Sequence, residues 1–183
     1  MKGWRIGATA QTAAMALACL ACAAGGAAAA ELRAEIRQAT PTGPGEVLGT
    51  VTLGDSAGGA AIKTALKGLP PGAHGFHIHE TGSCQPTTAN GAPVPAGGAG
   101  GHFDPQKTGK HDGPDGNGHQ GDLPVLQAAA DGTATQTLTA PHLKDVASLR
   151  GKAVMIHGGG DNYSDQPAPL GGGGPRIACG VIE

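Results

Sequence analysis

Apolar and polar residues alternate along several short stretches of the chain, with turn-forming residues between them. Alternation of this kind places apolar side chains on one face of a strand and polar side chains on the other. Residues 45–55, for example, alternate around Val47, Val51 and Leu53. Within residues 124–140, Asp131-Gly132 separates two runs, which is typical of a hairpin. The predicted strands are residues 31–39, 45–55, 60–69, 75–80, the two runs within 124–140, 152–159 and 176–183.

This number of short strands predicts an all-β fold, either a sandwich or a barrel. Only residues 141–151 resemble a helix, and they fit one turn at most. Two long segments, residues 81–122 and 158–175, are rich in Gly and Pro and have no usable periodicity. Long irregular segments in a compact domain are usually functional or disordered. Because the first segment contains several histidines, we expect it to be ordered.

The first 30 of the 183 residues have the features of a cleaved signal peptide. Lys2 and Arg5 precede an apolar, Ala-rich run, and four alanines at 27–30 offer a cleavage site. The run is too short and too weakly apolar for a membrane span, which needs about 20 residues. We expect cleavage after Ala30, which leaves one domain over residues 31–183.

The four cysteines are divided between the leader and the domain. Cys19 and Cys22 leave lipid attachment at the N-terminus as an alternative to simple cleavage. Cys84 and Cys179 are the pair within the domain. In an exported protein such a pair predicts one disulfide.

The charge of the domain argues against a nucleic-acid partner. Without the leader, 10 basic and 14 acidic side chains remain, a net charge of −4 with histidine neutral. The remaining aromatic residues are Phe76, Phe103 and Tyr163. Nucleic-acid binding depends on phosphate-neutralising charge and on aromatic stacking surfaces, and this domain is poor in both.

Six of the eight histidines form a pattern with one aspartate. In the strand at 75–80, His77 and His79 alternate with Phe76 and Ile78, so the two imidazoles share one face. Imidazole and carboxylate groups are ligands for zinc and copper. The pattern therefore predicts metal binding, with one ion or two left open by the spacing. The candidate ligands are His77, His79, His102, His111, His119, Asp122 and His157.

Other polar residues are interpreted more simply. We expect His74 and His142, which lie outside the pattern, to be at the surface. Asp112 and Asp115 are interpreted as solvated loop acids. Hydrolysis by a Ser-His-Asp triad is the rival enzyme class. The one G-x-S-x-G match, residues 54–58, lies between two predicted strands and not at the strand-to-helix turn that a nucleophile elbow requires.

Four motifs together resemble the bacterial periplasmic copper–zinc superoxide dismutases: GFHIHE, GGHFDP, GKHDGPDGNGHQGDLP and HGGGDNYSDQPAPLGGGGPRIACGVI. The resemblance extends from about residue 45 to the end of the chain. It implies a Greek-key β-sandwich or flattened barrel with two long functional loops. It also implies a periplasmic enzyme that converts two superoxide anions and two protons to dioxygen and hydrogen peroxide, with copper cycling between Cu(II) and Cu(I) and zinc structural. A homodimer and a monomer both remain open.

The resemblance also implies the metal ligands. His102 would be shared between the two ions and would take up and return a proton during the reaction. The copper ligands would be His77, His79, His102 and His157, and the zinc ligands His102, His111, His119 and Asp122.

Four further residues acquire roles from the same resemblance. Arg176 would lie beside the copper and guide superoxide, which makes Arg176 and His102 the catalytic residues. Asp161 would link a copper histidine to a zinc histidine. A disulfide between Cys84 and Cys179 would tie the first long loop to the last strand. The alternative function is a metal-delivery module on the same fold, but such a module needs no anion-binding guanidinium.

Overall fold

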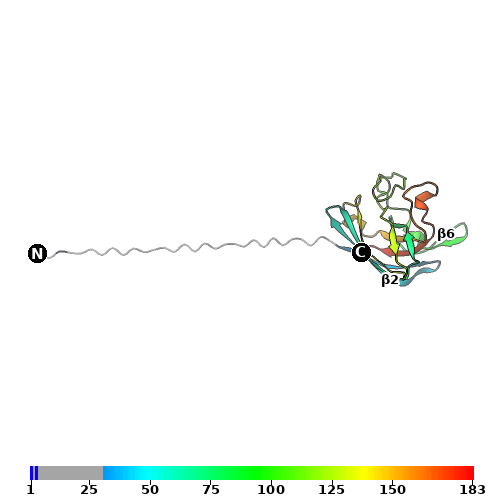
Figure 1. The fold of residues 1–183 in the computed structure, drawn as a ribbon, viewed down its shortest axis with the longest axis horizontal. Coiled ribbons are helices and arrows are strands. Elements are labelled where there is room, and N and C mark those ends of the chain that lie inside the picture. Colours follow the sequence, from blue (N-terminus) through cyan, green and yellow to red (C-terminus); the bar gives the residue numbers. More distant parts are fainter. Residues whose placement is uncertain (2, 4–30) are drawn as a thin grey trace.

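A computed structural model describes residues 1, 3 and 31–183 (Figure 1). The predicted leader, 1–30, lies outside the described residues apart from two positions. Among the described residues there is no helix with the length and apolar character needed to cross a membrane. The strands are β1 Leu32–Thr40, β2 Gly43–Ser56, β3 Gly59–Leu66, β4 Gly72–His74, β5 Phe76–His79, β6 Thr87–Ala89, β7 Ala92–Val94, β8 Leu126–Ala128, β9 Ala134–Ala140, β10 Ala153–His157 and β11 Arg176–Val181.

Seven strands form one curled antiparallel sheet in the order β5-β10-β11-β1-β2-β3-β9. Its two end strands are each preceded in the chain by a short strand, β4 before β5 and β8 before β9. These two short strands pair with each other. The pairing joins the two ends of the curled sheet, which agrees with the predicted flattened barrel of Greek-key type.

A bulge in β2, which the sequence did not reveal, changes which residues of this strand face the core. Val51 and Leu53 are fully buried as predicted, but Val47 is 42% exposed and Leu48 is buried in its place. The register with β1 skips a residue here, because Arg37 pairs with Val47 while Ile36 pairs with Gly49. An extra residue in one strand reverses the inward and outward positions that follow it. The prediction that Val47 faces the core is therefore wrong.

The two runs within 124–140 do not form the predicted hairpin. The turn exists, with Gly132 at φ +80° and its N–H donating to the carbonyl of Ala129 (2.9 Å). However, β8 pairs with β4, and β9 pairs with β3 along seven residues. The partner of β9 belongs to the curled sheet, whereas β8 and β4 form a separate two-stranded sheet.

A hairpin was missed inside the loop 81–122. Strands β6 and β7 pair around Asn90 and Gly91, both of which have positive φ. Asn-Gly is a strong sequence signal for such a turn, so the sequence contained the information. The single helical turn predicted in 141–151 is confirmed as a 3-10 turn, η2 Val146–Leu149, and two more 3-10 turns are η1 Gly97–Ala99 and η3 Pro169–Gly172.

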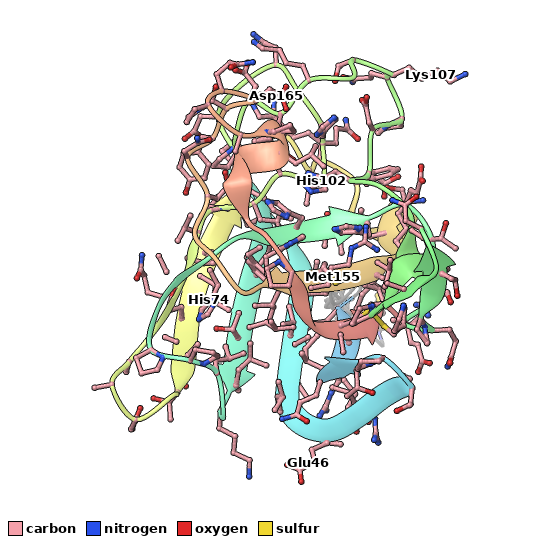
Figure 2. The ribbon with its side chains drawn as sticks, turned by 90° about the vertical axis from the view of Figure 1, so that its right-hand side faces the viewer. Glu46, His74, His102, Lys107, Met155 and Asp165 are labelled. Atoms are coloured by element: carbon pink, nitrogen blue, oxygen red, sulfur yellow. A yellow bond between two sulfur atoms is a disulfide. The ribbon has the colours of Figure 1, made fainter. Side chains whose placement is uncertain are left out.

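Strands β5 and β10 have two different buried faces. Phe76, Ile78, Val154 and Ile156 point into the main core. On the opposite face Met155 packs with a second, smaller cluster that includes the buried half of the disulfide. In a two-layer sandwich this second face would be solvated. Here the loops 81–122 and 158–175 lie over it, and Figure 2 shows them gathered on the side of the sheet where His102 is labelled.

Candidate metal centre

Strand pairing places the first three histidines side by side. His77 and His79 lie opposite Met155 and Ala153 of β10, and His157 ends that strand. All three share the face away from the main core, which the alternation in 75–80 predicted for His77 and His79. They are buried, with at most 8% of each residue exposed.

The long loop adds His102 and Asp122 by pairing with β5 at two points. His102 lies opposite His79 and Asp122 lies opposite His77 in isolated bridges. Ile78 holds both loop segments, because its N–H donates to Gly121 O and its carbonyl accepts from the N–H of Phe103, each at 2.8 Å. A Cβ on Gly121 would lie 2.3 Å from Ile78 O, so this close approach requires glycine.

Four histidines form the first group of possible ligands. One nitrogen from each of the four rings lies within 4.8 Å of the others, and the four are His77, His79, His102 and His157. Three inward nitrogens, His77 Nδ1, His79 Nε2 and His157 Nε2, are buried and have no hydrogen-bond partner among the described residues. The opposite nitrogen of each of these three rings donates to an oxygen: Asp161 Oδ2 (2.7 Å), Gly100 O (2.9 Å) and Gly174 O (3.1 Å). These bonds fix the tautomers and leave lone pairs pointing inward.

The protonation of this group suits metal binding. Burial lowers the pKa of His77 to about 3, that of His79 to about 2 and that of His157 to about 4. The pKa of His102 is also lowered, again chiefly by burial. The four imidazoles are therefore neutral at neutral pH, which is the form that coordinates metals.

A second group surrounds Asp122. His102 Nδ1 donates to Asp122 Oδ1 (2.9 Å), and His111 Nδ1 lies 2.9 Å from Oδ2 at an angle that makes no hydrogen bond. His119 Nδ1, also buried and unpartnered among the described residues, lies 3.4 Å from Oδ1. Within 4.8 Å, the mutually close ligand atoms come from His77, His102, His111 and Asp122. His119 is adjacent to this group but lies outside that limit, while His77 is included because its ring stacks on His102 with centroids 4.0 Å apart.

The electrostatics of the second group differ from those of the first. Burial acts to lower the pKa of His111, but the hydrogen bond to Asp161 and the nearby carboxylates of Asp122 and Asp161 outweigh it and raise the pKa to about 9. Burial likewise opposes ionisation of Asp122, yet His102 and His111 hold its pKa below the ordinary value. The protein therefore keeps an anion here and stabilises positive charge beside it.

Asp161 joins the two groups. Its buried carboxylate accepts from His77 Nε2 through Oδ2 (2.7 Å) and from His111 Nε2 through Oδ1 (2.8 Å). Burial alone would raise its pKa, but bonds from His111 and His77 lower it. This is the position that the resemblance implied for Asp161, between a histidine of each group.

Arg176 lies next to the first group, at the start of β11 and opposite His157 in the sheet. Nη1 donates to Ala96 O and Nη2 to Gly100 O, both at 2.7 Å. Gly100 O also accepts from His79, so one carbonyl orients both side chains. Two of the five guanidinium N–H donors are used in this way, and the charge is fixed in place.

The disulfide prediction is confirmed. Cys84 and Cys179 are bonded across 95 residues of sequence and connect the loop that carries η1 to β11. The loop segment 96–100, whose carbonyl groups accept hydrogen bonds from Arg176, follows Cys84 in the chain. The disulfide therefore holds this segment near β11.

His74 was predicted at the surface, and that prediction is wrong. His74 is only 1% exposed. Its Nδ1 lies 2.8 Å from His157 O and its Nε2 lies 2.7 Å from Pro70 O. The ring therefore braces the end of the strand that carries His157. A single histidine between Ala73 and Gly75 gives no sequence signal for this role. His142 is exposed as predicted, as is Asp115, whereas Asp112 is half-buried and shapes its loop by accepting from Asn117 N–H.

The comparisons with known proteins agree with this geometry. Residues 47–182 match the family described as copper/zinc superoxide dismutase. The chain is 56% identical over 164 residues to superoxide dismutase [Cu-Zn] 2 of Salmonella typhimurium, covering 90% of this chain and 94% of the relative. The Cu/Zn superoxide dismutase structure from Brucella abortus has a TM-score of 0.83 and 52% identity, covering 84% of this chain and 100% of the other. The solution structure of the monomeric copper, zinc superoxide dismutase from Salmonella enterica has a TM-score of 0.75 and 55% identity, with the same coverage.

Proposed function

Since the chain belongs to the copper/zinc superoxide dismutase family and has that enzymatic activity, we propose that its buried histidine cluster holds one copper and one zinc ion. The observation that carries this proposal is the set of five buried imidazole nitrogens without partners among the described residues. A buried polar atom without a partner costs roughly 1–3 kcal/mol. Five such nitrogens in one cluster fit a site built to receive cations.

The nitrogens divide between the two ions. Three unpartnered atoms, on His77, His79 and His157, belong to the four-histidine group and would hold copper together with His102. The other two, on His111 and His119, face Asp122 and would hold zinc with that carboxylate and with His102. His102 would be shared because its Nδ1 faces Asp122, which leaves Nε2 for the four-histidine group.

The residues of this chain then have distinct tasks. Bound copper supplies one-electron oxidation and reduction of superoxide, while zinc has no redox chemistry and holds the loop. His102 can carry a proton at Nε2, because its Nδ1 side is committed to the zinc site. Arg176 binds the superoxide anion by charge and hydrogen bonding, and its contacts with Ala96 and Gly100 keep it oriented.

The proposal is tested by superoxide consumption of the metal-replete protein with and without cyanide, a ligand for copper. We expect rapid consumption that cyanide abolishes. His102→Ala should lose most of the activity and change the metal content, whereas His142→Ala, an exposed histidine away from the cluster, should retain both. Full copper and zinc content without superoxide consumption would instead support the metal-delivery function.

Export to the periplasm is a second part of the proposal. It is supported by the signal-like sequence of residues 1–30, by bacterial relatives, and by the disulfide, which is typical of oxidising compartments. Sequencing the N-terminus of protein from the periplasmic fraction should give Glu31 as the first residue. A lipid-modified cysteine at position 19 or 22 would show the lipoprotein alternative to be correct.

The oligomeric state is proposed to be monomeric. In the domain that the structure describes, the exposed large apolar residues are Val47, Tyr163 and Leu170. Val47 lies on the β2 bulge and the other two lie on the loop 158–175, so they do not form one patch of the kind that dimers bury. The Salmonella enterica relative is described as monomeric. Sedimentation at micromolar concentration should give the mass of one chain, and a dimer mass would refute this proposal.

A further inference from the structure

Asp165, in the loop 158–175, has both carboxylate oxygens committed to main-chain groups. Oδ2 accepts from the N–H of His111 (2.9 Å), and Oδ1 accepts from the N–H of Leu170 (3.1 Å). The first contact crosses between the two long loops, and the second closes Asp165's own loop. Figure 2 shows Asp165 above His102, where the two loops lie over the sheet.

His111 is consequently held by two carboxylates from the same loop. Asp161 binds its ring at Nε2, and Asp165 binds its main chain. A ring bond alone leaves the backbone free to rotate about it, whereas ring and backbone bonds together fix where His111 Nδ1 points. That nitrogen is the one that faces Asp122.

The hydrogen bond from the Leu170 N–H to Asp165 fixes a turn that packs against Asp161 and His111. Gly171, next to Leu170, lies so close to the Asp161–His111 pair that a Cβ would be 2.0 Å from Asp161 Oδ1 and 2.8 Å from His111 Nε2. Gly171 is buried, and its N–H donates to Ser164 O (3.0 Å). The bond from Leu170 to Asp165 therefore holds the 170–171 turn against the Asp161–His111 pair.

From these contacts we infer that Asp165 is a positioning residue for the zinc half of the centre, one that sets the orientation of His111 and the rate at which zinc leaves. The inference rests on the zinc assignment of the proposed function. Groups that orient metal ligands typically change metal affinity by roughly 10- to 100-fold when they are removed. Asp165 acts only through main-chain N–H groups, so neither ligand identity nor the copper group needs to change.

Two variants remove either both or one of the two carboxylate oxygens of Asp165. Asp165→Ala removes both acceptors and leaves the His111 N–H unpaired. Asp165→Asn keeps the size of the side chain but retains one acceptor, because the amide nitrogen cannot accept a hydrogen bond. Asp104→Ala is the matched control: Asp104 also accepts from loop N–H and hydroxyl groups, those of Gly109 and Thr108, but it does not contact His111.

The test measures the transfer of zinc from the metal-replete protein to a chromophoric chelator, and the visible spectrum of cobalt(II) placed in the zinc site. Zinc transfer should be about 10-fold or more faster in Asp165→Ala, intermediate in Asp165→Asn and unchanged in Asp104→Ala. The cobalt bands should shift in the Asp165 variants, which a role confined to loop stability would not produce. The Asn variant preserves the test if the Ala variant does not fold.

Wild-type zinc transfer rates and cobalt spectra in both Asp165 variants would overturn the inference. If the wild-type protein itself retains no zinc, the zinc assignment of the proposed function fails as well. The two failures are therefore distinguishable: the first occurs in a zinc-replete protein and concerns Asp165 alone, while the second appears before any substitution is made.

Discussion

At the scale of single residues, the centre is organised by the nitrogens that face away from it. For each of three rings, those of His77, His79 and His157, the outward nitrogen donates to a carboxylate or carbonyl oxygen. Each bond selects one tautomer and one ring orientation, so the inward lone pair is set before any ion binds. Imidazole–metal bonding is therefore favoured by residues that are not ligands.

Arg176 offers the sharpest residue-level prediction because it acts on the substrate and not on the ligands. Arg176→Ala should retain copper and zinc at wild-type stoichiometry while the dismutation rate falls by roughly tenfold or more, the range of local electrostatic steering. Arg176→Lys should recover part of the loss, since the charge remains but the planar donors do not. Arg150→Ala, which removes an exposed arginine beyond η2, should have little effect.

Salt provides an independent check on Arg176. Screening weakens only an attraction that exists, so added salt should slow the wild-type enzyme more than the Ala variant. Pulse radiolysis of metal-replete protein at two ionic strengths measures both rates. An Ala variant with wild-type rate and wild-type salt response would exclude the guiding role.

At the scale of elements, the sequence predicts strands better than it predicts their partners. Alternation located β1, β3 and β5, and a short apolar run located β10, because each of these strands buries one or both faces regularly. It misplaced Val47, since a bulge is set by the pairing of β1 with β2 and leaves no local pattern. It also paired the runs around Asp131-Gly132 with each other, because a turn signal does not show which strand lies across the sheet.

The bulge predicts opposite outcomes for two neighbouring residues. Leu48→Ala should destabilise the domain by roughly 2–5 kcal/mol, because Leu48 is buried and its truncation leaves a cavity. Val47→Ala should change stability by no more than about 0.5 kcal/mol, as is usual at exposed positions. Urea unfolding monitored by circular dichroism compares the two midpoints. Equal losses, or a larger loss for Val47, would contradict the observed register.

Residue type and spacing predict the candidate site as one set of residues, and its division into two groups came only from the resemblance to a known family. The six histidines and Asp122 were recognisable by residue type and position, and their roles came from the motifs that resemble a known family. Spacing could not show that His74 braces His157 or that Asp165 binds the main chain of His111. Both contacts join segments far apart in the chain through backbone atoms, which carry no residue-specific signal.

At the scale of the whole molecule, the metal centre lies between the sheet and two loops with little regular structure. The loops are joined to the sheet by the Cys84–Cys179 bond, by the bridges from β5 and by Asp161. The domain has a net charge of −4, so attraction of an anionic substrate depends on local positive charge at the centre. Stability and activity thus depend on the same set of buried side chains.

Removing the metals should therefore destabilise the whole domain. A ligand that binds only the folded state at about 1,000 times its Kd contributes about 4 kcal/mol. For a domain of this size that corresponds to a fall in Tm on the order of 10 °C. Calorimetry of the metal-replete and chelator-stripped protein, followed by re-addition of zinc alone, should show the loss and a partial recovery. A Tm that is independent of both metals would contradict a structural role for zinc.

In the proposed metal centre, one copper and one zinc ion share His102. The most direct test of this sharing is a crystal structure of the metal-replete protein with anomalous diffraction recorded at the copper and zinc absorption edges. We predict one copper peak among His77 Nδ1, His79 Nε2, His157 Nε2 and His102 Nε2, and one zinc peak among His102 Nδ1, His111 Nδ1, His119 Nδ1 and Asp122. A single shared peak, the two metals in exchanged positions, or a zinc peak without His102 in contact would contradict a centre in which the two ions share His102.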